Sequence, residues 1–425
     1  MRESATMHAE TRPGLIGARV KRVEDPRLLT RRGSYTDDKQ VPGALHVAFR
    51  RSDHPHARIL ATRLDAAASM PGVIGVFDAG TLDGHARPVR ATSRMKDYHA
   101  TELWPLARGK VRYVGEPVVA VVAESRYLAE DAIEQVEIDY DPLPVAIHAE
   151  EAAADGAPPL HEAAGTNVLV RREFVRGDVD AAFARAALRV GARFRMHRKT
   201  PAAMENRTYL AEWDPARQAL MLHASTQVPG IVRDALVESL DLPGHRLRVV
   251  APDVGGGFGG KASLYPEEIV VAALARHLEQ PVKWCCDRLE DLATTSQGFD
   301  ETVDAELAVD AEGRLLGLRA EVLGDVGAYS IYPWTAALEP VQVVSFLPGP
   351  YRLPAYRGRV RAVATPKAPT GPYRGVGRPI SAFVMERLID MAARRLGLDP
   401  VEMRRLNLVR AEEFPYKTGS GLVWD

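Results

Sequence analysis

The amino-acid sequence predicts an α+β fold divided between at least two domains. The chain has 425 residues, enough for two or three hydrophobic cores, and 46% of them are hydrophobic, as in ordinary globular proteins. Up to about residue 150, short strand patterns mix with a helix pattern, whereas the later sequence has longer β-rich segments and a strongly amphipathic helix. Residues 151–164 between them are small and proline-containing, which is typical of a linker.

The part before the linker begins with a polar and loose tail at residues 1–14. Apolar runs bounded by turn residues predict four strands, at residues 44–50, 72–77, 118–122 and 136–140. The third has no polar alternation, which indicates burial on both faces. Ser125 is a suitable N-cap for a helix that reaches about residue 136.

The part after the linker contains both strands and long helices. A strand is predicted at 220–223, and an alternating pattern over 304–322 surrounds the turn residues Asp310-Ala311-Glu312-Gly313, which predicts a hairpin. Helices are predicted at 266–278 and 381–396. In the second helix five apolar residues share one face: Val384, Leu388, Met391, Ala392 and Leu396.

Charge and cysteine content exclude several classes of protein. The formal net charge is −1, so the balance does not indicate a nucleic-acid or anionic-membrane partner. The two cysteines, Cys285-Cys286, are adjacent, which suits neither a disulfide nor an iron–sulfur cluster. The N-terminus has no apolar signal region, and no apolar run approaches the length of a membrane span. We therefore expect a cytoplasmic protein.

The most informative segment is the glycine-rich loop at residues 255–261, Gly-Gly-Gly-Phe-Gly-Gly-Lys, placed between an apolar approach and the 266–278 helix. Backbone without Cβ atoms can approach a ligand closely and point several N–H groups at it. The loop nearly fits a phosphate-binding P-loop, but Ala262 stands where the Mg²⁺-binding hydroxyl is required. An anion cradle and a ligand-free glycine turn both remain open at this point.

Two further segments have a related character. Ser225-Thr226-Gln227 places an amide at the end of a strand, and residues 370–379 form a glycine–arginine turn before the 381–396 helix. The Arg374 fork suits a phosphate or a carboxylate. The alternatives are a surface amide for Gln227 and an ordinary turn that leads into a helix for 370–379.

Other polar candidates favour structural roles. We expect His54 and His56 to lie on one face of a strand with no third metal ligand. Glu205 is expected to be structural, and the pair Glu267-Glu268 is expected to sit in the first turn of a helix, where carboxylates favour its dipole.

Taken in order, these segments closely resemble the large, molybdenum-binding subunit of the xanthine dehydrogenase, aldehyde oxidase and carbon monoxide dehydrogenase family. The resemblance covers about residues 15–425. It rests on six motifs: Gly33-Ser34-Tyr35-Thr36-Asp37-Asp38, His56-Ala57-Arg58-Ile59, Val111-Arg112-Tyr113-Val114-Gly115-Glu116-Pro117-Val118, Ser225-Thr226-Gln227, the loop 255–261, and Pro372-Tyr373-Arg374-Gly375-Val376-Gly377-Arg378.

The resemblance implies an α/β hammerhead domain at residues 15–150 and a first, mixed α+β molybdopterin-binding domain at 165–425, joined by the linker at 151–164. It further implies a molybdenum–molybdopterin cofactor, in bacteria usually the cytosine dinucleotide form, whose metal is held by the pterin dithiolene and not by the chain. Gln227 would hydrogen-bond an oxo ligand of molybdenum, and the backbone at Arg374 would contact the same centre. The metal end of the cofactor would lie against Gly256, Gly257, Phe258 and Gly259.

The implied reaction is hydroxylation of an electron-poor carbon with oxygen from water, helped by a glutamate base. Electrons would pass to [2Fe-2S] and FAD subunits. Gly375 replaces the cysteine of the copper-containing carbon monoxide enzymes, and Ala262 replaces the glutamate of purine oxidisers. We therefore expect an aldehyde or N-heteroaromatic substrate.

The family's large subunit continues past residues 414–425 into a second molybdopterin-binding domain that carries the general-base glutamate. The resemblance thus places no catalytic base in this chain and implies a partner chain or domain. A split subunit, a fragment and an inactive paralogue remain open, the last serving as a non-catalytic cofactor-binding or assembly protein. We also expect exposed apolar surface where the second domain would dock.

Overall fold

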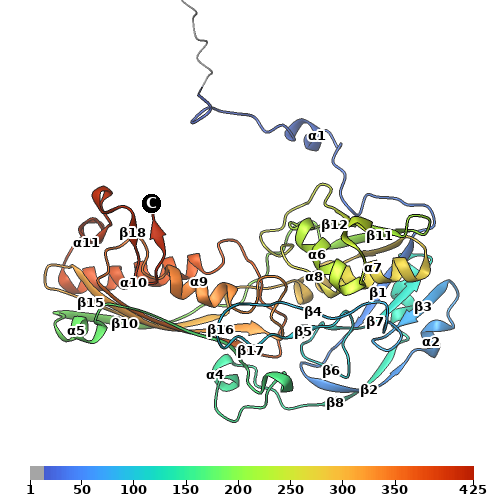
Figure 1. Cartoon of the computed structure of the whole chain (residues 1–425), viewed down its shortest axis with the longest axis horizontal. Coiled ribbons are helices and arrows are strands. Elements are labelled where there is room, and N and C mark those ends of the chain that lie inside the picture. The colour runs from blue at the N-terminus through green and yellow to red at the C-terminus, as the bar shows by residue number, and fades with distance from the viewer. Residues whose placement is uncertain (1–13) are drawn as a thin grey trace, which may run out of the picture.

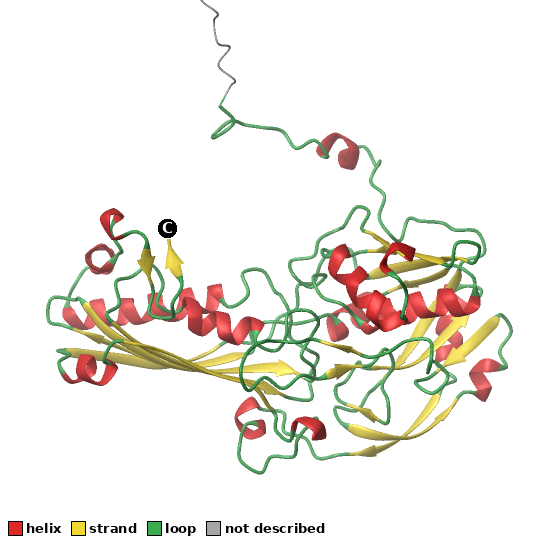
Figure 2. Ribbon diagram, viewed as in Figure 1, coloured by secondary structure: helices red, strands yellow, loops and turns green. Residues whose placement is uncertain are grey.

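The structure is a computed structural model that describes residues 14–425, arranged in two lobes side by side (Figure 1). Most of the predicted loose tail, residues 1–13, lies outside the described part. One lobe is built on a seven-stranded sheet and the other on a long five-stranded sheet with helices along one face (Figure 2). None of the helices within residues 14–425 is both long enough and apolar enough to cross a membrane.

The seven-stranded sheet has the order β13-β12-β11-β14-β1-β7-β3. Its strands are β1 (Leu45–Arg51), β3 (Val73–Phe77), β7 (Pro117–Ala123), β11 (Thr208–Asp214), β12 (Ala219–Ala224), β13 (Leu247–Val250) and β14 (Val282–Cys285). The strands predicted at 44–50, 72–77, 118–122 and 220–223 are confirmed. Because β1 pairs in parallel with β14, strands from both sides of the predicted linker share one sheet.

Both faces of this sheet are covered. Helices α6 (Pro229–Leu240) and α7 (Pro266–Leu278) pack on one face with Ala120 and Val122 of β7. On the other face Val119 and Val121 contact α3 (Arg126–Ile133) and the small sheet of β2 (Ala57–Arg63), β6 (Lys110–Val111) and β8 (Glu137–Pro142). Two-sided burial explains why β7 lacks polar alternation, as predicted. Helix α1 (Asp25–Leu29) lies on the N-terminal segment that leads into this lobe. The short elements α2 (Asp65–Ala68), β4 (Val89–Arg90) and β5 (Glu102–Leu103) complete the lobe.

The predicted linker is more ordered than its composition indicates. It begins inside α4 (Ala149–Ala152), which packs on the second sheet, and it ends with the 3₁₀ turn η1 (Glu162–Ala164). Leu160 is buried, and its N–H donates to the side chain of Asn167. The segment is therefore a packed connection and not a free tether.

The second sheet has the order β10-β15-β16-β17-β9 and carries α9 and α10 on its apolar face. Its strands are β9 (Val168–Arg176), β10 (Leu188–Arg195), β15 (Glu301–Val309), β16 (Leu315–Gly327) and β17 (Ala355–Ala364). The predicted hairpin around residues 310–313 is the β15–β16 connection. The remaining elements, taken over both lobes, are α5 (Val179–Ala184), η2 (Gly244–Arg246), α8 (Arg288–Thr294), α9 (Leu338–Phe346), α11 (Pro400–Asn407), η3 (Ala411–Glu413), β18 (Tyr416–Lys417) and β19 (Val423–Trp424).

The long helix α10 (Arg378–Leu396) confirms the predicted helix and begins three residues earlier, with a proline in its first turn. It ends at Gly397, which has φ +71° and forms a left-handed C-cap. Of the predicted apolar face, Val384, Leu388 and Ala392 are fully buried against the second sheet.

An apolar groove of about 600 Å³ runs between α10 and the C-terminal hairpin. Phe346, Met385, Leu408, Phe414 and Trp424 contribute to its lining. Phe414 is 45% exposed and Leu408 is 38% exposed. The chain thus presents apolar surface of the kind that the sequence predicts for a docking face.

Burial of Glu268 makes the stability of the fold pH-dependent. Burial raises the pKa of this carboxyl to about 8, although its Oε2 accepts a hydrogen bond from the Tyr265 N–H at the start of α7. A carboxyl with a raised pKa in the folded state stabilises the fold below its unfolded pKa of 4.5, and this contribution is lost as the pH rises towards 8. We predict that the free energy of unfolding falls between about pH 5 and pH 8.

Urea titrations at several pH values would measure this slope. Glu268→Gln keeps the acceptor for Tyr265 but cannot ionise, so it is expected to flatten the slope. Glu134→Gln, at an exposed position at the end of α3, serves as the matched control and should leave the slope unchanged. An unaltered slope in Glu268→Gln would show that this carboxyl does not control the pH dependence.

Candidate functional site

The structure brings together the three segments predicted to form a site. Gln227 follows the end of β12, the loop 255–261 connects β13 to α7, and Arg374 precedes α10. The Gln227 Oε1 atom accepts hydrogen bonds from the Gly259 N–H at 3.0 Å and the Lys261 N–H at 3.3 Å. The Phe258 carbonyl accepts one from the Arg374 N–H at 2.9 Å. Both lobes therefore contribute backbone to one place.

The side chain of Gln227 has a fixed orientation. A backbone N–H can only donate, so the amide atom that faces Gly259 and Lys261 must be the oxygen. The Gln227 N–H in turn donates to the Lys261 carbonyl at 2.8 Å. The Nε2 group is left with no protein acceptor among residues 14–425, and the side chain is exposed. Gln227 thus presents an oriented pair of N–H donors to a ligand.

The glycine loop presents donors as well. Its backbone takes left-handed conformations at Gly256 (φ +101°), Phe258 (φ +50°) and Gly259 (φ +100°). Within the described part of the chain, the N–H groups of Gly256, Gly257 and Phe258 have no protein acceptor. Successive N–H groups in such a curved loop form a nest for an anion or an oxygen ligand. The Phe258 ring beside them is 47% exposed, which leaves an apolar surface open at the same place.

Two of the glycines are required by contacts within the protein. A Cβ atom at Gly259 would lie 2.3 Å from the Pro372 carbonyl oxygen, and one at Gly257 would lie 2.4 Å from Gln227 Oε1. The sequence predicts glycine here for close approach of a ligand. The structure adds that Gly257 and Gly259 let the three segments meet.

The backbone of Arg374 contacts the glycine loop. Its N–H donates to the Phe258 carbonyl at 2.9 Å. Its guanidinium is exposed and makes no hydrogen bond or ion pair with any residue in the described range. The positive-φ residues Gly375 and Val376 follow directly. The backbone contact between Arg374 and a cofactor remains a prediction.

A buried ion pair supports the loop from behind. The Lys261 ammonium lies 2.9 Å from Glu205 Oε2, and the two side chains are 3% and 12% exposed. Burial lowers the pKa of Lys261, and the Glu205 carboxylate acts in the opposite direction. Glu205 is therefore structural, as expected, and it is the ion-pair partner of Lys261, the one cationic residue of the loop.

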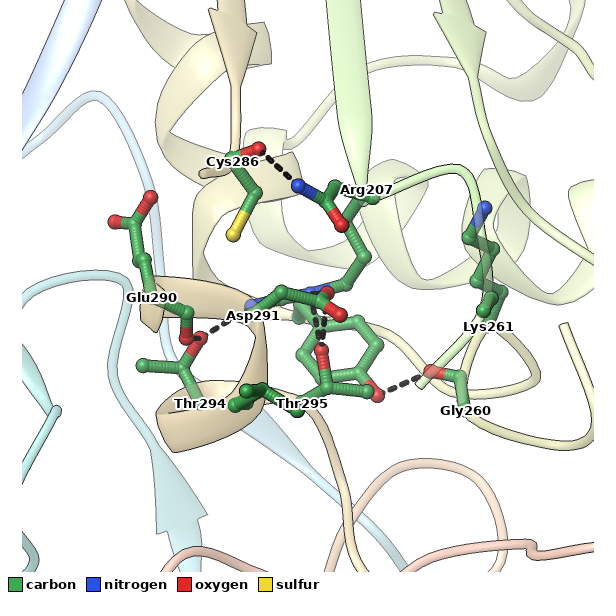
Figure 3. A network of polar contacts seen from close by, with 12 residues as sticks. Arg207, Gly260, Lys261, Cys286, Glu290, Asp291, Thr294 and Thr295 are labelled. Atoms are coloured by element: carbon green, nitrogen blue, oxygen red, sulfur yellow. Dashed lines mark hydrogen bonds and ion pairs between the residues drawn. The ribbon is translucent and has the colours of Figure 1, made fainter. Parts of the chain in front are cut away.

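Deeper still lies Arg207, a residue that the sequence reasoning did not single out (Figure 3). Its guanidinium donates to Glu267, Thr294 and Thr295, and it lies 4.1 Å from the centre of the Tyr265 ring. The Tyr265 hydroxyl in turn donates to the Gly260 carbonyl. Arg207 lies directly before β11, which contains the run Tyr209-Leu210-Ala211, and an arginine beside such a buried apolar run is the signal in the sequence that indicates a buried, paired cation.

The remaining candidates have structural positions. Glu267 and Glu268 do begin helix α7, as predicted, but both are buried and take part in specific contacts besides the helix dipole. His54 and His56 lie in bends before β2, so the predicted strand placement is wrong; the bend follows from the intervening Pro55. Within residues 14–425 no group of three His, Cys, Asp or Glu side chains is arranged to hold a metal ion.

The groups gathered at this place are suited to binding and orienting a ligand. The site offers the Gln227 amide, three backbone N–H groups and an arginine, all of them donors. Such a set fits a ligand rich in oxygen acceptors, including phosphate. Carboxylates near the loop are engaged in ion pairs behind it.

Comparisons with known proteins agree with this fold. Residues 160–408 match the family model of the molybdopterin cofactor-binding domain, and residues 30–144 match that of the aldehyde oxidase and xanthine dehydrogenase a/b hammerhead domain. The first match alone covers more than half of the chain. The chain belongs to the xanthine dehydrogenase, aldehyde oxidase and carbon monoxide dehydrogenase family of molybdopterin-binding large subunits.

Individual relatives cover this chain almost completely. The nicotine 6-hydroxylase large subunit of Paenarthrobacter nicotinovorans is 39% identical over 97% of this chain and 50% of its own length. The crystal structure of quinoline 2-oxidoreductase from Pseudomonas putida 86 superposes with a TM-score of 0.93 and 38% identity, over 95% of this chain and 51% of that one. The nicotinate dehydrogenase large molybdopterin subunit of Eubacterium barkeri is 29% identical over 96% of this chain and 92% of its own length. The chain thus spans about half the length of the first two.

Replacement of Gly259 tests whether the close contact of the segments matters. Gly259→Ala adds a Cβ that collides with the Pro372 carbonyl, in addition to the strain of a positive φ. Gly397→Ala is the matched control, because Gly397 has φ +71° but open space around its Cβ position. We predict a loss of about 1–2 kcal/mol for the control and about 1–3 kcal/mol more for Gly259→Ala.

Both losses are measured as changes in the free energy of unfolding by urea. Equal losses in the two variants would mean that residues 255–261 and 372–374 are not held in contact in solution.

Proposed function

We propose that this chain forms one wall of the cofactor site of a molybdenum hydroxylase and acts together with a second polypeptide. The observation that carries the proposal is the meeting of Gln227, the glycine loop and residues 372–374, which leaves the Gln227 Nε2 group and several loop N–H groups without a protein acceptor among the described residues. The proposed cofactor is the cytosine dinucleotide form of molybdenum–molybdopterin. When bound, it supplies the two-electron redox chemistry, and the chain supplies binding and orientation.

The residues take distinct roles in this proposal. The Gln227 Nε2 group donates to an oxygen at the metal end of the cofactor, since its Oε1 is already held by the loop. The N–H groups of Gly256, Gly257 and Phe258 donate to oxygen acceptors of the same ligand, with Gly259 giving the loop its curvature. The backbone of Arg374 contacts the loop at Phe258, and its exposed guanidinium suits a phosphate or a carboxylate. These donors are positioned before the ligand arrives, which lowers the cost of binding.

The proposed substrate is an aldehyde or an N-heteroaromatic compound, oxidised with oxygen from water. Support for this class comes from Ala262 and Gly375, which stand where purine oxidisers have a glutamate and copper-containing carbon monoxide enzymes a cysteine. Two relatives are named for N-heterocycles, nicotine and quinoline.

The second polypeptide would bring the other wall of the site and the general-base glutamate. This chain matches 50% of the length of the nicotine 6-hydroxylase large subunit and 92% of the length of the nicotinate dehydrogenase subunit. The apolar groove beside α10 offers surface for such a partner. Electrons would leave through [2Fe-2S] and FAD subunits, and the assembly would work in the cytoplasm.

The decisive experiment purifies the chain together with the products of its neighbouring genes. Molybdenum and pterin contents are then measured, and reduction of an artificial electron acceptor is followed with quinoline or nicotine as substrate. A complex that stayed free of metal would overturn the catalytic proposal and favour an assembly role.

Removal of the Gln227 donor tests its role within an active complex. Gln227→Ala is expected to lower kcat by about 10²–10³-fold, the usual effect of losing one oriented donor at a reacting centre. Gln135→Ala, at an exposed amide after α3, is the control and should leave the rate unchanged. Full activity in Gln227→Ala would remove this residue from the site.

A further inference from the structure

One carboxylate oxygen behind the glycine loop accepts three hydrogen bonds from three separate positions. Glu205 Oε2 accepts from the Gly255 N–H at 2.7 Å, the Ser225 hydroxyl at 2.7 Å and the Lys261 ammonium at 2.9 Å. Gly255 and Lys261 are the two ends of the loop, and Ser225 is two residues before Gln227. In a separate hydrogen bond, the Glu205 N–H donates to the Gly255 carbonyl at 3.1 Å.

We propose that Glu205 is the positioning residue of this site, a clamp that closes the glycine loop at both ends and holds it against the strand end that carries Gln227. The effect of the clamp on catalysis rests on the proposed function. The clamp itself is a property of this chain and can be tested without any cofactor.

The contacts explain why this role falls to Glu205. A loop with five glycines has many accessible conformations, so ordering it is entropically costly. The Glu205 carboxylate holds Gly255 and Lys261 at one point. The Gln227 Oε1 atom accepts hydrogen bonds from the Gly259 and Lys261 N–H groups of the same loop. A Cβ atom at Gly255 would lie 2.5 Å from the Glu205 Cβ, so the two backbones are also in close contact. The free N–H donors of the loop thereby keep their direction without a ligand.

A simpler role for Glu205 would be to neutralise Lys261, which is buried. The other oxygen of Glu205 separates the two explanations, because Oε1 is buried and accepts no hydrogen bond from the described residues. In Glu205→Gln the amide nitrogen can take the Oε1 position, and the remaining oxygen can still accept from Gly255 and Ser225. Glutamine therefore preserves the clamp but not the charge, and alanine preserves neither.

The experiment uses the full chain in a Lys261→Met background, which removes the buried ammonium from every variant. Hydrogen–deuterium exchange of peptides that cover residues 255–261 and 225–227 reports the order of the loop, without any cofactor. Lys261→Met loses the attachment at residue 261, so the clamp predicts exchange somewhat faster than in the unaltered chain, and the same exchange when Glu205→Gln is added. It predicts a further increase of about 10- to 100-fold with Glu205→Ala, as expected for the loss of the two remaining hydrogen bonds, from Gly255 and Ser225.

Two controls make the result specific. Glu212→Ala removes a half-exposed carboxylate from β11 and should leave these peptides unchanged. A peptide from β16 reports global unfolding. Equally slow exchange in the alanine and glutamine variants would overturn the clamp and leave charge neutralisation as the role of Glu205. Faster exchange of the β16 peptide to the same extent would also overturn it, because Glu205 would then hold the whole fold. The proposed function is tested separately, by molybdenum content and activity.

Discussion

The carboxylate of Glu267, shared by two buried arginines, is the interaction on which the rest of the structure depends. Its Oε1 accepts from Arg51 of β1 at 2.7 Å, and its Oε2 accepts from Arg207, the residue before β11, at 3.1 Å. Burial raises the pKa of Glu267, but the two guanidiniums outweigh burial and hold the pKa below its usual value. Loss of one partner from such a buried group typically costs about 3–5 kcal/mol. This single contact joins the first part of the chain, the second part and the helix that follows the glycine loop.

Local patterns in the sequence predict the elements but not their pairings. Apolar runs bounded by turn residues locate β1, β3 and β7, and the helical spacing of apolar residues locates α10. The parallel pairing of β1 with β14 joins residues more than 200 positions apart and leaves no local signal. The contacts of Arg207 and Glu205 leave no local signal for the same reason, because their partners come from distant segments of the chain.

The candidate site was predicted as a set of segments, and the structure supplies their contacts. The resemblance to a family identified Gln227, the glycine loop and Arg374. It did not reveal that Gln227 Oε1 is held by the loop, nor that the Arg374 N–H is used by Phe258. Such details depend on backbone conformations with positive φ, which a chain adopts only where its surroundings impose them. Phe258 and Val376 are two such positions, with φ +50° and +52°.

The sheet shared by the two sequence-defined domains bears on how genes of this family can be divided or recombined. A break within residues 151–164 would leave β1 and β14 on different fragments, and an unpaired strand edge on each fragment favours aggregation. Exchange of the hammerhead region between relatives would also have to preserve the match between Arg51 and Glu267. The shared sheet therefore makes residues 151–164 an unfavourable place to divide the chain.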